Sequence, residues 1–280
     1  MLTFMRKLAP FIFLMWLPTL LPAAAHQRIT IKGSDTMVIL VQRWTELYPE
    51  KKNVEFQVTG GGSGVGIAAL INGTTDICAS SRPMKPAEID QLKAKTGSKG
   101  IEVRVARDGL SVYAHKSNPV KQLTIEQIGK IFKGEITNWK DVGGPNKTIV
   151  LYSRENNSGT YEFFKDHVLN KKDFAAQTQH MAGTAALINA VSKDPFAIGY
   201  GGAAYAKNVK SIAVAVEAGK PYVLPTQKTI LSYEYPIARF LYFYLKARPE
   251  GDTKKFIDWV IGKGGQKTVQ EVGYYPIKKS

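Results

Sequence analysis

The sequence contains one cysteine, Cys78, so no disulfide can form within the chain and no cluster of thiolates can hold a metal. Cys78 lies in the apolar run 77–79, where a buried and unreactive thiol is expected. Histidine is scarce as well. No pair of histidines has the i,i+4 spacing of a helical metal site; the four are His26, His115, His167 and His180. The sequence therefore predicts no metal site and no cofactor.

The local signatures of common catalytic sites are also missing. No G-x-S-x-G nucleophile elbow occurs in the sequence. The glycine-rich segment 60–66 lacks the Lys-Ser/Thr ending of a nucleotide phosphate loop. These absences favour a binding protein over an enzyme.

The apolar run near the N-terminus, Leu8–Leu21, is shorter than the ~20 residues that span a bilayer. It follows Arg6 and Lys7 and leads into the small residues PAAA, which end at Ala25. A positive start, an apolar middle and small residues at the end are typical of a secretory signal peptide. We expect cleavage near Ala25, without lipid attachment, and export to the periplasm. An uncleaved membrane anchor is the alternative interpretation.

Positive charge exceeds negative charge, with a formal net charge of +15 that falls to +13 when residues 1–25 are removed. A nucleic-acid surface would gather this charge beside stacking aromatic side chains. Here the lysine pairs are scattered, at 51–52, 171–172, 254–255 and 278–279. The pattern predicts a solvated surface and no nucleic-acid partner, while diffuse positive charge favours the encounter with small anions.

Strands and helices alternate along the mature segment, which predicts an α/β fold with mostly parallel sheets covered by helices on both faces. Strands are expected at 28–32, 53–59, 76–79, 101–106, 110–115, 148–153, 196–200 and 238–245. Helices are expected at 36–48, 65–71, 86–95, 124–132, 158–167, 184–191, 252–261 and 265–272. The pattern restarts after residue 110, and the strand at 238–245 returns the chain. We therefore expect a signal peptide (1–25) and two lobes, 26–112 plus 232–280 and 113–231.

Three turns rich in glycine, serine and threonine stand directly before predicted helices. They are Gly33-Ser34-Asp35-Thr36, Gly62-Ser63-Gly64 and Asn157-Ser158-Gly159-Thr160. A helix start presents unpaired backbone N–H groups and the positive end of the helix dipole, both of which favour anions. One such turn is also what an ordinary capped helix looks like. Three of them in one chain predict an oxyanion site.

Two arginines follow predicted buried strands, where ligands of parallel sheets bind. Arg154 comes four residues before Ser158, and Arg82 follows Ser80 and Ser81. A guanidinium group can bind an oxyanion through two hydrogen bonds. For both arginines a structural ion pair with a carboxylate is the alternative.

At these residues the chain resembles the phosphate-binding proteins of bacterial ABC transporters, and the resemblance covers nearly the whole mature segment. The motifs that carry it are GSDTM at 33–37, GGSGVG at 61–66, DICASSRPM at 76–84, RENNSGT at 154–160, and FIDW, GGQK and EVGYYPI within 256–277. The resemblance implies a two-lobed periplasmic binding protein of type II, with two hinge crossovers, that closes over one phosphate ion. It implies ligand contacts from Thr36, Met37, Ser63, Arg154, Ser158, Gly159 and Thr160.

One position departs from the family. Well-known members carry an aspartate where this chain has Ser81, and that carboxylate accepts the proton of hydrogen phosphate. A serine can donate or accept, so sulfate or another tetrahedral oxyanion is the alternative ligand. Asp35 is a second candidate acceptor, and its alternative role is a helix cap. The candidate phosphate site thus comprises Ser34, Asp35, Thr36, Met37, Ser63, Ser81, Arg82, Arg154, Ser158, Gly159 and Thr160.

The expected function is that of an exported monomer that captures inorganic phosphate and delivers it to a membrane ABC permease. A protein of the same fold that binds another oxyanion is the first alternative. An exported protein that serves phosphate sensing or adhesion is the second.

Overall fold

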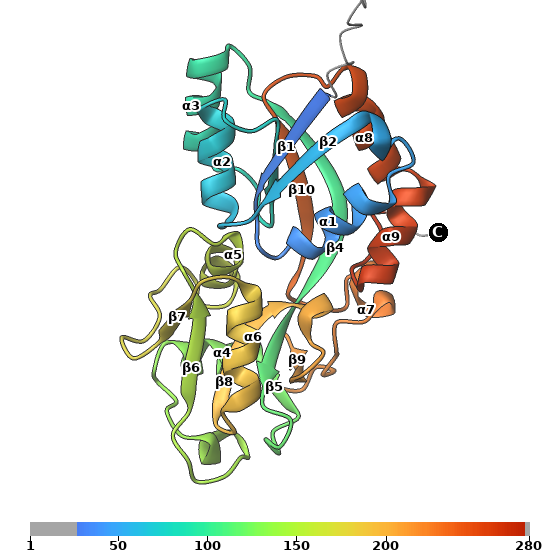
Figure 1. Ribbon diagram of the computed structural model, residues 1–280. Coiled ribbons are helices and arrows are strands. Elements are labelled where there is room, and N and C mark those ends of the chain that lie inside the picture. Colours follow the sequence, from blue (N-terminus) through green and yellow to red (C-terminus); the bar gives the residue numbers. More distant parts are fainter. Residues whose placement is uncertain (1–26, 278–280) are drawn as a thin grey trace, which may run out of the picture.

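The structure, a computed structural model, describes residues 27–277. The expected signal peptide therefore lies outside the described residues. Between residues 27 and 277, no helix is both long enough and apolar enough to cross a membrane. The described chain forms two bodies that are stacked end to end and joined by strands β4 and β10 (Figure 1).

The first body comprises residues 27–109 and 238–277, and its strands run in the order β2-β1-β3-β10-β4. These strands are β1 (Gln27–Gly33), β2 (Val54–Thr59), β3 (Ile77–Ser80), β10 (Ala238–Leu245) and the first part of β4 (Ile101–Ala114). Helices α2 (Ser63–Ile71) and α3 (Pro86–Thr96) cover one face. The other face carries α1 (Val38–Leu47), α8 (Gly251–Ile261) and α9 (Lys263–Val272), with a short 3₁₀ turn at Lys51–Asn53 (Figure 1).

The second body comprises residues 110–237. Its strands are the end of β4, β5 (Gln122–Thr124), β6 (Val150–Arg154), β7 (Gln179–Met181), β8 (Ala197–Gly202) and β9 (Lys210–Ala215). Its helices are α4 (Ile125–Phe132), α5 (Gly159–His167), α6 (Thr184–Lys193) and α7 (Gln227–Leu231). Short 3₁₀ turns lie at Trp139–Val142 and Ala203–Tyr205. Helix α5 lies at the end of this body that meets the first one (Figure 1).

The sheets are mixed, so the expectation of mostly parallel sheets is wrong for the middle strands. Strand β1 is parallel to β2 and β3, and β6 is parallel to β7 and β8. Strand β10 instead runs antiparallel to both β3 and β4, and β4 runs antiparallel to β8 and β9. The reason is the path of the chain: β10 returns from the second body and inserts between strands that run the other way.

Strand β4 is the main connection between the bodies. The sequence predicted two strands here, at 101–106 and 110–115, but the structure has one strand of 14 residues. Its first part pairs with β10 and its last part with β8 and β9. Gly109 and Ala238 face each other where the two long strands leave the first body.

Each body has its own apolar core. Trp44, Phe243 and Phe256 are fully buried in the core of the first body, and Phe132 and Trp139 in that of the second. The indole N–H of Trp44 donates to the carbonyl of Gly265, at 2.9 Å, and so ties α1 to α9. The second core also contains residues near the crossing point, namely Leu110, Val112, Tyr235 and Ile237.

Helices α4 and α3 start within one residue of the positions expected from the sequence. Thr124 is the N-cap of α4 and accepts from the Gln127 N–H, and the Gln127 side chain accepts from the Thr124 N–H in return. Helix α3 begins at Pro86 and ends at Gly97, whose φ of 76° suits glycine. Local sequence thus placed most helix starts to within a few residues.

Candidate functional site

Four hydroxyl side chains meet where the two bodies touch. Thr36, Ser63 and Ser81 come from the first body, Thr160 comes from the second, and all four are buried. The Thr36 Oγ1 lies 2.8 Å from the Thr160 Oγ1, and the Ser63 Oγ lies 3.2 Å from the Ser81 Oγ. The Ser81 Oγ lies 3.5 Å from the Thr160 Oγ1. The three helix-start turns of the sequence therefore converge with Ser81, which follows β3, in one cluster.

Arg154 and Asp35 form an ion pair across the same boundary. The Arg154 guanidinium donates to the Asp35 Oδ2 at 2.6 Å and to the Thr184 Oγ1 at 2.8 Å. The other carboxylate oxygen of Asp35 accepts from the Gly61 N–H at 2.8 Å. The side chain of Arg154 is 2% exposed, whereas that of Asp35 is 21% exposed.

The helix-cap role considered for Asp35 is wrong. The N-cap of α1 is Met37, and no side chain caps that helix end. The Asp35 carboxylate instead links the glycine-rich turn to Arg154, because a glycine at position 60 leaves room for it. A Cβ at position 60 would lie 2.4 Å from the Asp35 Oδ1. Asp35 thus stays a candidate acceptor beside the hydroxyl cluster.

The start of α5 packs closely against the first body. Ser158 is its N-cap, and the Ser158 Oγ accepts from the N–H groups of Thr160 and Tyr161. A Cβ on Gly159 would lie 2.3 Å from the Ser63 Oγ and 2.9 Å from the Ser81 Oγ. Only a glycine lets the helix start approach these hydroxyls so closely.

Ser34 and Met37 of the first turn are buried, and their backbone groups make hydrogen bonds within the first body. The Ser34 carbonyl accepts from the Met37 N–H at 2.9 Å, and the Ser34 N–H donates to the Ala79 carbonyl. The Met37 side chain lies in the core of the first body. The Met37 side chain therefore contributes to that core, and its N–H group is already bonded to Ser34.

Arg82 makes ion pairs rather than joining the hydroxyl cluster. Its guanidinium makes two hydrogen bonds to the Glu88 carboxylate, at 2.7 and 2.8 Å. Its Nε lies 2.6 Å from the Glu162 Oε2 across the boundary, close enough for an ion pair but not aligned as a hydrogen bond. Lys85 also pairs with Glu162. Burial by itself raises the pKa of Glu88, but hydrogen bonds from Arg82 and the Lys85 N–H lower that pKa overall.

The sequence reasoning missed a second buried ion pair beside the cluster. The Arg239 Nε and NH2 donate to the Asp108 Oδ2 at 3.1 and 2.8 Å, and NH2 also donates to the Thr160 Oγ1 at 3.0 Å. Burial raises the pKa of the Asp108 carboxyl, and the Arg239 guanidinium opposes that rise. The available signal was Arg239, which is the one charged residue of strand β10. Asp108 gave no such signal, because β4 also contains Glu102, Arg104 and Arg107.

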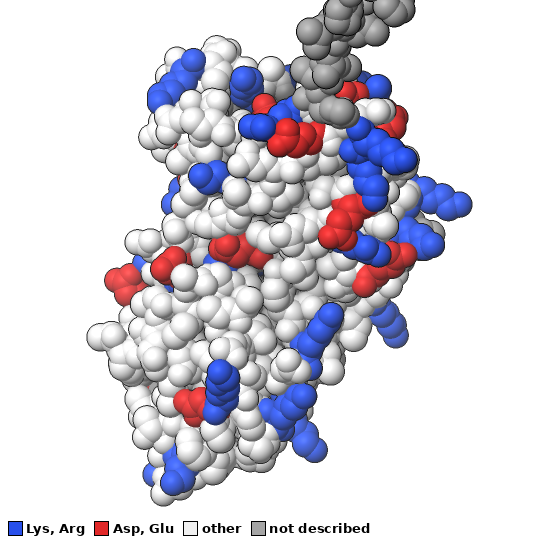
Figure 2. Space-filling model, in the orientation of Figure 1, with Lys and Arg blue, Asp and Glu red and all other residues white. Residues whose placement is uncertain are grey.

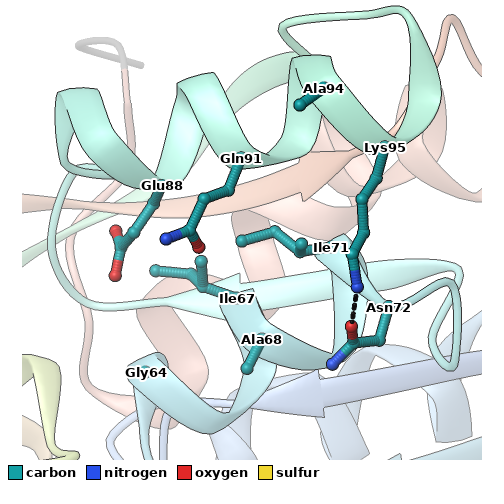
Figure 3. Close-up of a pocket in the computed structure, with 9 residues that line it drawn as sticks. All are labelled: Gly64, Ile67, Ala68, Ile71, Asn72, Glu88, Gln91, Ala94 and Lys95. Atoms are coloured by element: carbon teal, nitrogen blue, oxygen red, sulfur yellow. Dashed lines mark hydrogen bonds between the residues drawn. The ribbon is translucent and has the colours of Figure 1, made fainter.

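A cavity of about 350 Å³ lies away from the hydroxyl cluster, between helices α2 and α3 (Figure 3). Ile67 and Ile71 of α2 face Gln91 of α3 there, and Lys95 bonds to Asn72 at its far end. Isoleucine and alanine side chains form much of its lining, and its polar side chains include the Glu88 carboxylate and the hydrogen-bonded pair Lys95 and Asn72, so it does not resemble an oxyanion site.

Two other features of the described residues concern metal ligands and the single thiol. Between residues 27 and 277, no group of three or more His, Cys, Asp or Glu side chains could hold a metal. Burial raises the pKa of the Cys78 thiol, as expected for an unreactive cysteine. On the face shown in Figure 2, basic side chains are spread over both bodies with acidic ones among them.

The fold and the polar cluster between two bodies define the class of the protein. The family model of the PBP superfamily domain matches residues 22–263. The phosphate-binding protein PstS of Pseudomonas aeruginosa is 35% identical in an alignment of 266 positions that covers 88% of this chain and 81% of that protein. The PstS of Staphylococcus saprophyticus is 33% identical over 88% of this chain and 79% of its own. The chain belongs to the PstS family of phosphate-binding proteins within the PBP superfamily.

Solved structures of the family have the same fold. A phosphate ABC transporter substrate-binding protein from Clostridium perfringens, solved with bound phosphate, aligns with a TM-score of 0.83 at 29% identity and covers 90% of this chain and all of its own. An ABC-type phosphate transport receptor from Vibrio cholerae aligns with a TM-score of 0.70 at 28% identity, over 88% of this chain and 99% of its own. The expectation of a binding protein that is not an enzyme is therefore confirmed.

Proposed function

We propose that the protein captures inorganic phosphate between its two bodies and delivers it to an ABC permease. The observation that carries the proposal is the buried cluster of the Thr36, Ser63, Ser81 and Thr160 hydroxyls, together with the buried Arg154 guanidinium that pairs with Asp35 next to Thr36. Hydroxyl and guanidinium donors held away from water bind an oxyanion strongly, because water does not compete for them. Membership of the PstS family supports phosphate as that oxyanion.

The two bodies act as lobes that close over the ligand. Several hydrogen bonds and ion pairs link them at the site: Asp35 with Arg154, Thr36 with Thr160, and the Gly64 N–H with the Asn157 carbonyl. The chain crosses between the bodies in β4 and in the segment that enters β10 at Ala238, and these two crossings serve as the hinge. The two cores also touch through Tyr275, which packs in the second core, and Ala204, which packs in the first. The packing of Leu110 and Ile237 in the second core supports boundaries at Gly109 and Ala238, a few residues from the expected 112/113 and 231/232.

The ligand contacts follow from this geometry. Thr36, Ser63, Ser81 and Thr160 supply hydroxyl groups, Arg154 supplies its guanidinium, and Ser158 and Gly159 supply the start of α5, with Ser34 and Met37 shaping the first turn. Arg82 holds the two lobes together through Glu162 and contributes positive charge from outside the cluster. No cofactor takes part in this function.

The protein works outside the cytoplasm as a monomer. Residues 1–25 direct it to the periplasm, where cleavage near Ala25 releases it, and its partner is the membrane permease. The relatives support this proposal: one solved structure of the same fold is described as a periplasmic phosphate-binding protein.

Calorimetric titration of the mature protein with phosphate and with sulfate tests the function. We expect phosphate to bind at micromolar concentration or below, and sulfate to bind more weakly. The absence of phosphate binding at that concentration would refute the proposal.

A specific observation favours a second candidate function, the binding of another tetrahedral oxyanion such as sulfate. Ser81 brings a hydroxyl, and no carboxylate, to the position where well-known members have aspartate. We propose that Asp35, instead of residue 81, accepts the hydrogen bond from the protonated oxygen of hydrogen phosphate. Each oxygen of its carboxylate accepts one hydrogen bond in the structure, so lone pairs remain for a further one.

Replacing Asp35 by asparagine should therefore reduce the preference for phosphate over sulfate by roughly tenfold, since one charged hydrogen bond is worth about 1.5–3 kcal/mol. Titrations of both anions against this variant measure the ratio. Asp258→Asn is the matched control, because its exposed carboxylate on α8 lies far from the cluster. An unchanged ratio would show that Asp35 only positions Arg154.

A further inference from the structure

A buried ion pair lies directly behind the hydroxyl cluster, where the two long strands cross between the bodies. Arg239 of β10 and Asp108 of β4 face each other in the register of the antiparallel pair. Their side chains are 3% and 0% exposed. The Arg239 guanidinium also lies against the ring of Phe163 on α5, with its Cζ 5.3 Å from the ring centre. One side chain of the hinge thus contacts the helix whose start carries Thr160.

The direction of the hydrogen bonds around Thr160 follows from this contact. A guanidinium group can only donate, so the Thr160 Oγ1 accepts from Arg239. The single hydroxyl proton of Thr160 then points away from Arg239. The Thr36 Oγ1 and the Ser81 Oγ lie 2.8 and 3.5 Å from the Thr160 Oγ1, and in each of these pairs either oxygen can be the donor. The backbone N–H of Ser81 constrains the Ser63 Oγ in the same way, at 3.0 Å.

Two hydroxyl groups of the cluster, those of Thr160 and Ser63, therefore each accept one fixed hydrogen bond before any ligand arrives, which directs their protons away from Arg239 and the Ser81 N–H. An anion can only accept hydrogen bonds from such groups, so their orientation in advance lowers the ordering cost of binding. Asp108 keeps Arg239 in place, because two of its hydrogen bonds go to the Asp108 Oδ2 and fix the plane of the guanidinium.

We propose that Arg239 is a positioning residue of the oxyanion site, which it serves by holding the Thr160 hydroxyl as a donor to the bound anion, while Asp108 fixes Arg239. This inference rests on the proposed function and deepens it. It also explains why an arginine stands at the start of β10, whose other residues are uncharged. Because the Thr160 proton is offered to any oxyanion, Arg239 contributes affinity for phosphate and sulfate alike, whereas Asp35 contributes the difference between them.

The test is a double-mutant cycle between Arg239→Gln and Thr160→Val, read by calorimetric titration with inorganic phosphate. Each single variant should weaken phosphate binding by roughly tenfold or more, the effect of losing one hydrogen bond to a charged group. The double variant should bind no more than about twofold more weakly than Thr160→Val alone, because Arg239 acts through that hydroxyl. Arg104→Gln, on the exposed part of β4, is the control with the same change of charge.

A structural role for Arg239 predicts other results. If the two losses multiply in the double variant, or if Arg239→Gln leaves the affinity within twofold of the wild type, the inference is overturned. Where Arg239→Gln fails to fold, Arg239→Lys takes its place. A lysine keeps the positive charge beside Asp108, but its ammonium group lacks the planar guanidinium that bonds to Asp108 and Thr160 together. The Arg239→Lys variant should therefore bind phosphate more weakly and keep the melting temperature of the wild type.

The outcome also separates this inference from the proposed function. Failure of the wild-type protein to bind phosphate would refute both. Normal binding by the wild type together with normal binding by Arg239→Lys would refute the role of Arg239 alone. The ratio of phosphate to sulfate affinity should not change in the Arg239 variants, and a changed ratio would contradict the assignment.

Discussion

Replacing Arg154 by alanine should weaken phosphate binding by about 2–5 kcal/mol, or roughly 30- to 5,000-fold in Kd. The variant loses the guanidinium that lies, 2% exposed, beside the hydroxyl cluster. It also leaves the Asp35 carboxylate without its cation, so that a negative charge faces the incoming anion. Calorimetric titration with phosphate measures the loss.

Two companion variants make this prediction sharper. Arg104→Ala removes an equal charge from an exposed site and should leave the affinity almost unchanged. Adding Asp35→Asn to Arg154→Ala removes the unpaired carboxylate and should recover part of the lost affinity. An Arg154→Ala variant that binds phosphate as the wild type does would place the site elsewhere in the protein.

The largest expected effect on stability is that of Trp44→Ala, at about 3–5 kcal/mol. The indole is fully buried, packs edge-on against Phe243 at 5.6 Å between ring centres, and donates to the Gly265 carbonyl. Its removal leaves a cavity between α1, α9 and the sheet, and an unpaired carbonyl group. Urea unfolding followed by circular dichroism measures the change.

The controls for Trp44 separate its volume from its hydrogen bond. Trp44→Phe keeps most of the ring contact and loses only the donor, so it should cost less than the alanine variant. Leu47→Ala, on the exposed side of the same helix, should change the stability by no more than about 0.5 kcal/mol. A loss below about 1 kcal/mol for Trp44→Ala would mean that α1 can repack against the sheet.

Much of the fold could be predicted because its signals are local. The helices expected to start at Pro86 and Thr124 and the helix expected over 36–48 depend only on neighbours within a few residues. The strand at 238–245 was also found from its apolar run. The direction of that strand relative to its neighbours could not be predicted, because the same apolar run suits a parallel and an antiparallel partner.

The candidate site could likewise be predicted only in part. Glycine and hydroxyl residues at 62–64 and 157–160 indicated anion-binding helix starts from local chemistry alone, and the structure brings those turns together. The partners of the charged side chains could not be read in this way. The position of Arg82 and Arg154 after buried strands made both of them candidate anion ligands, and the resemblance implied a contact from Arg154. Only the structure shows Arg82 bonded to Glu88 and Arg154 bonded to Asp35.

The sequence by itself thus determined the family, the alternation of helices and strands, and the types of donor that the site can offer. These depend on residue chemistry and on short spacings. The tertiary structure decided which charges meet: Asp35 with Arg154, and Asp108 with Arg239, pairs separated by 119 and 131 residues. The physical reason is that both pairs depend on how β4 and β10 cross between the two bodies, and that register is set by the packing of whole sheets rather than by any local pattern.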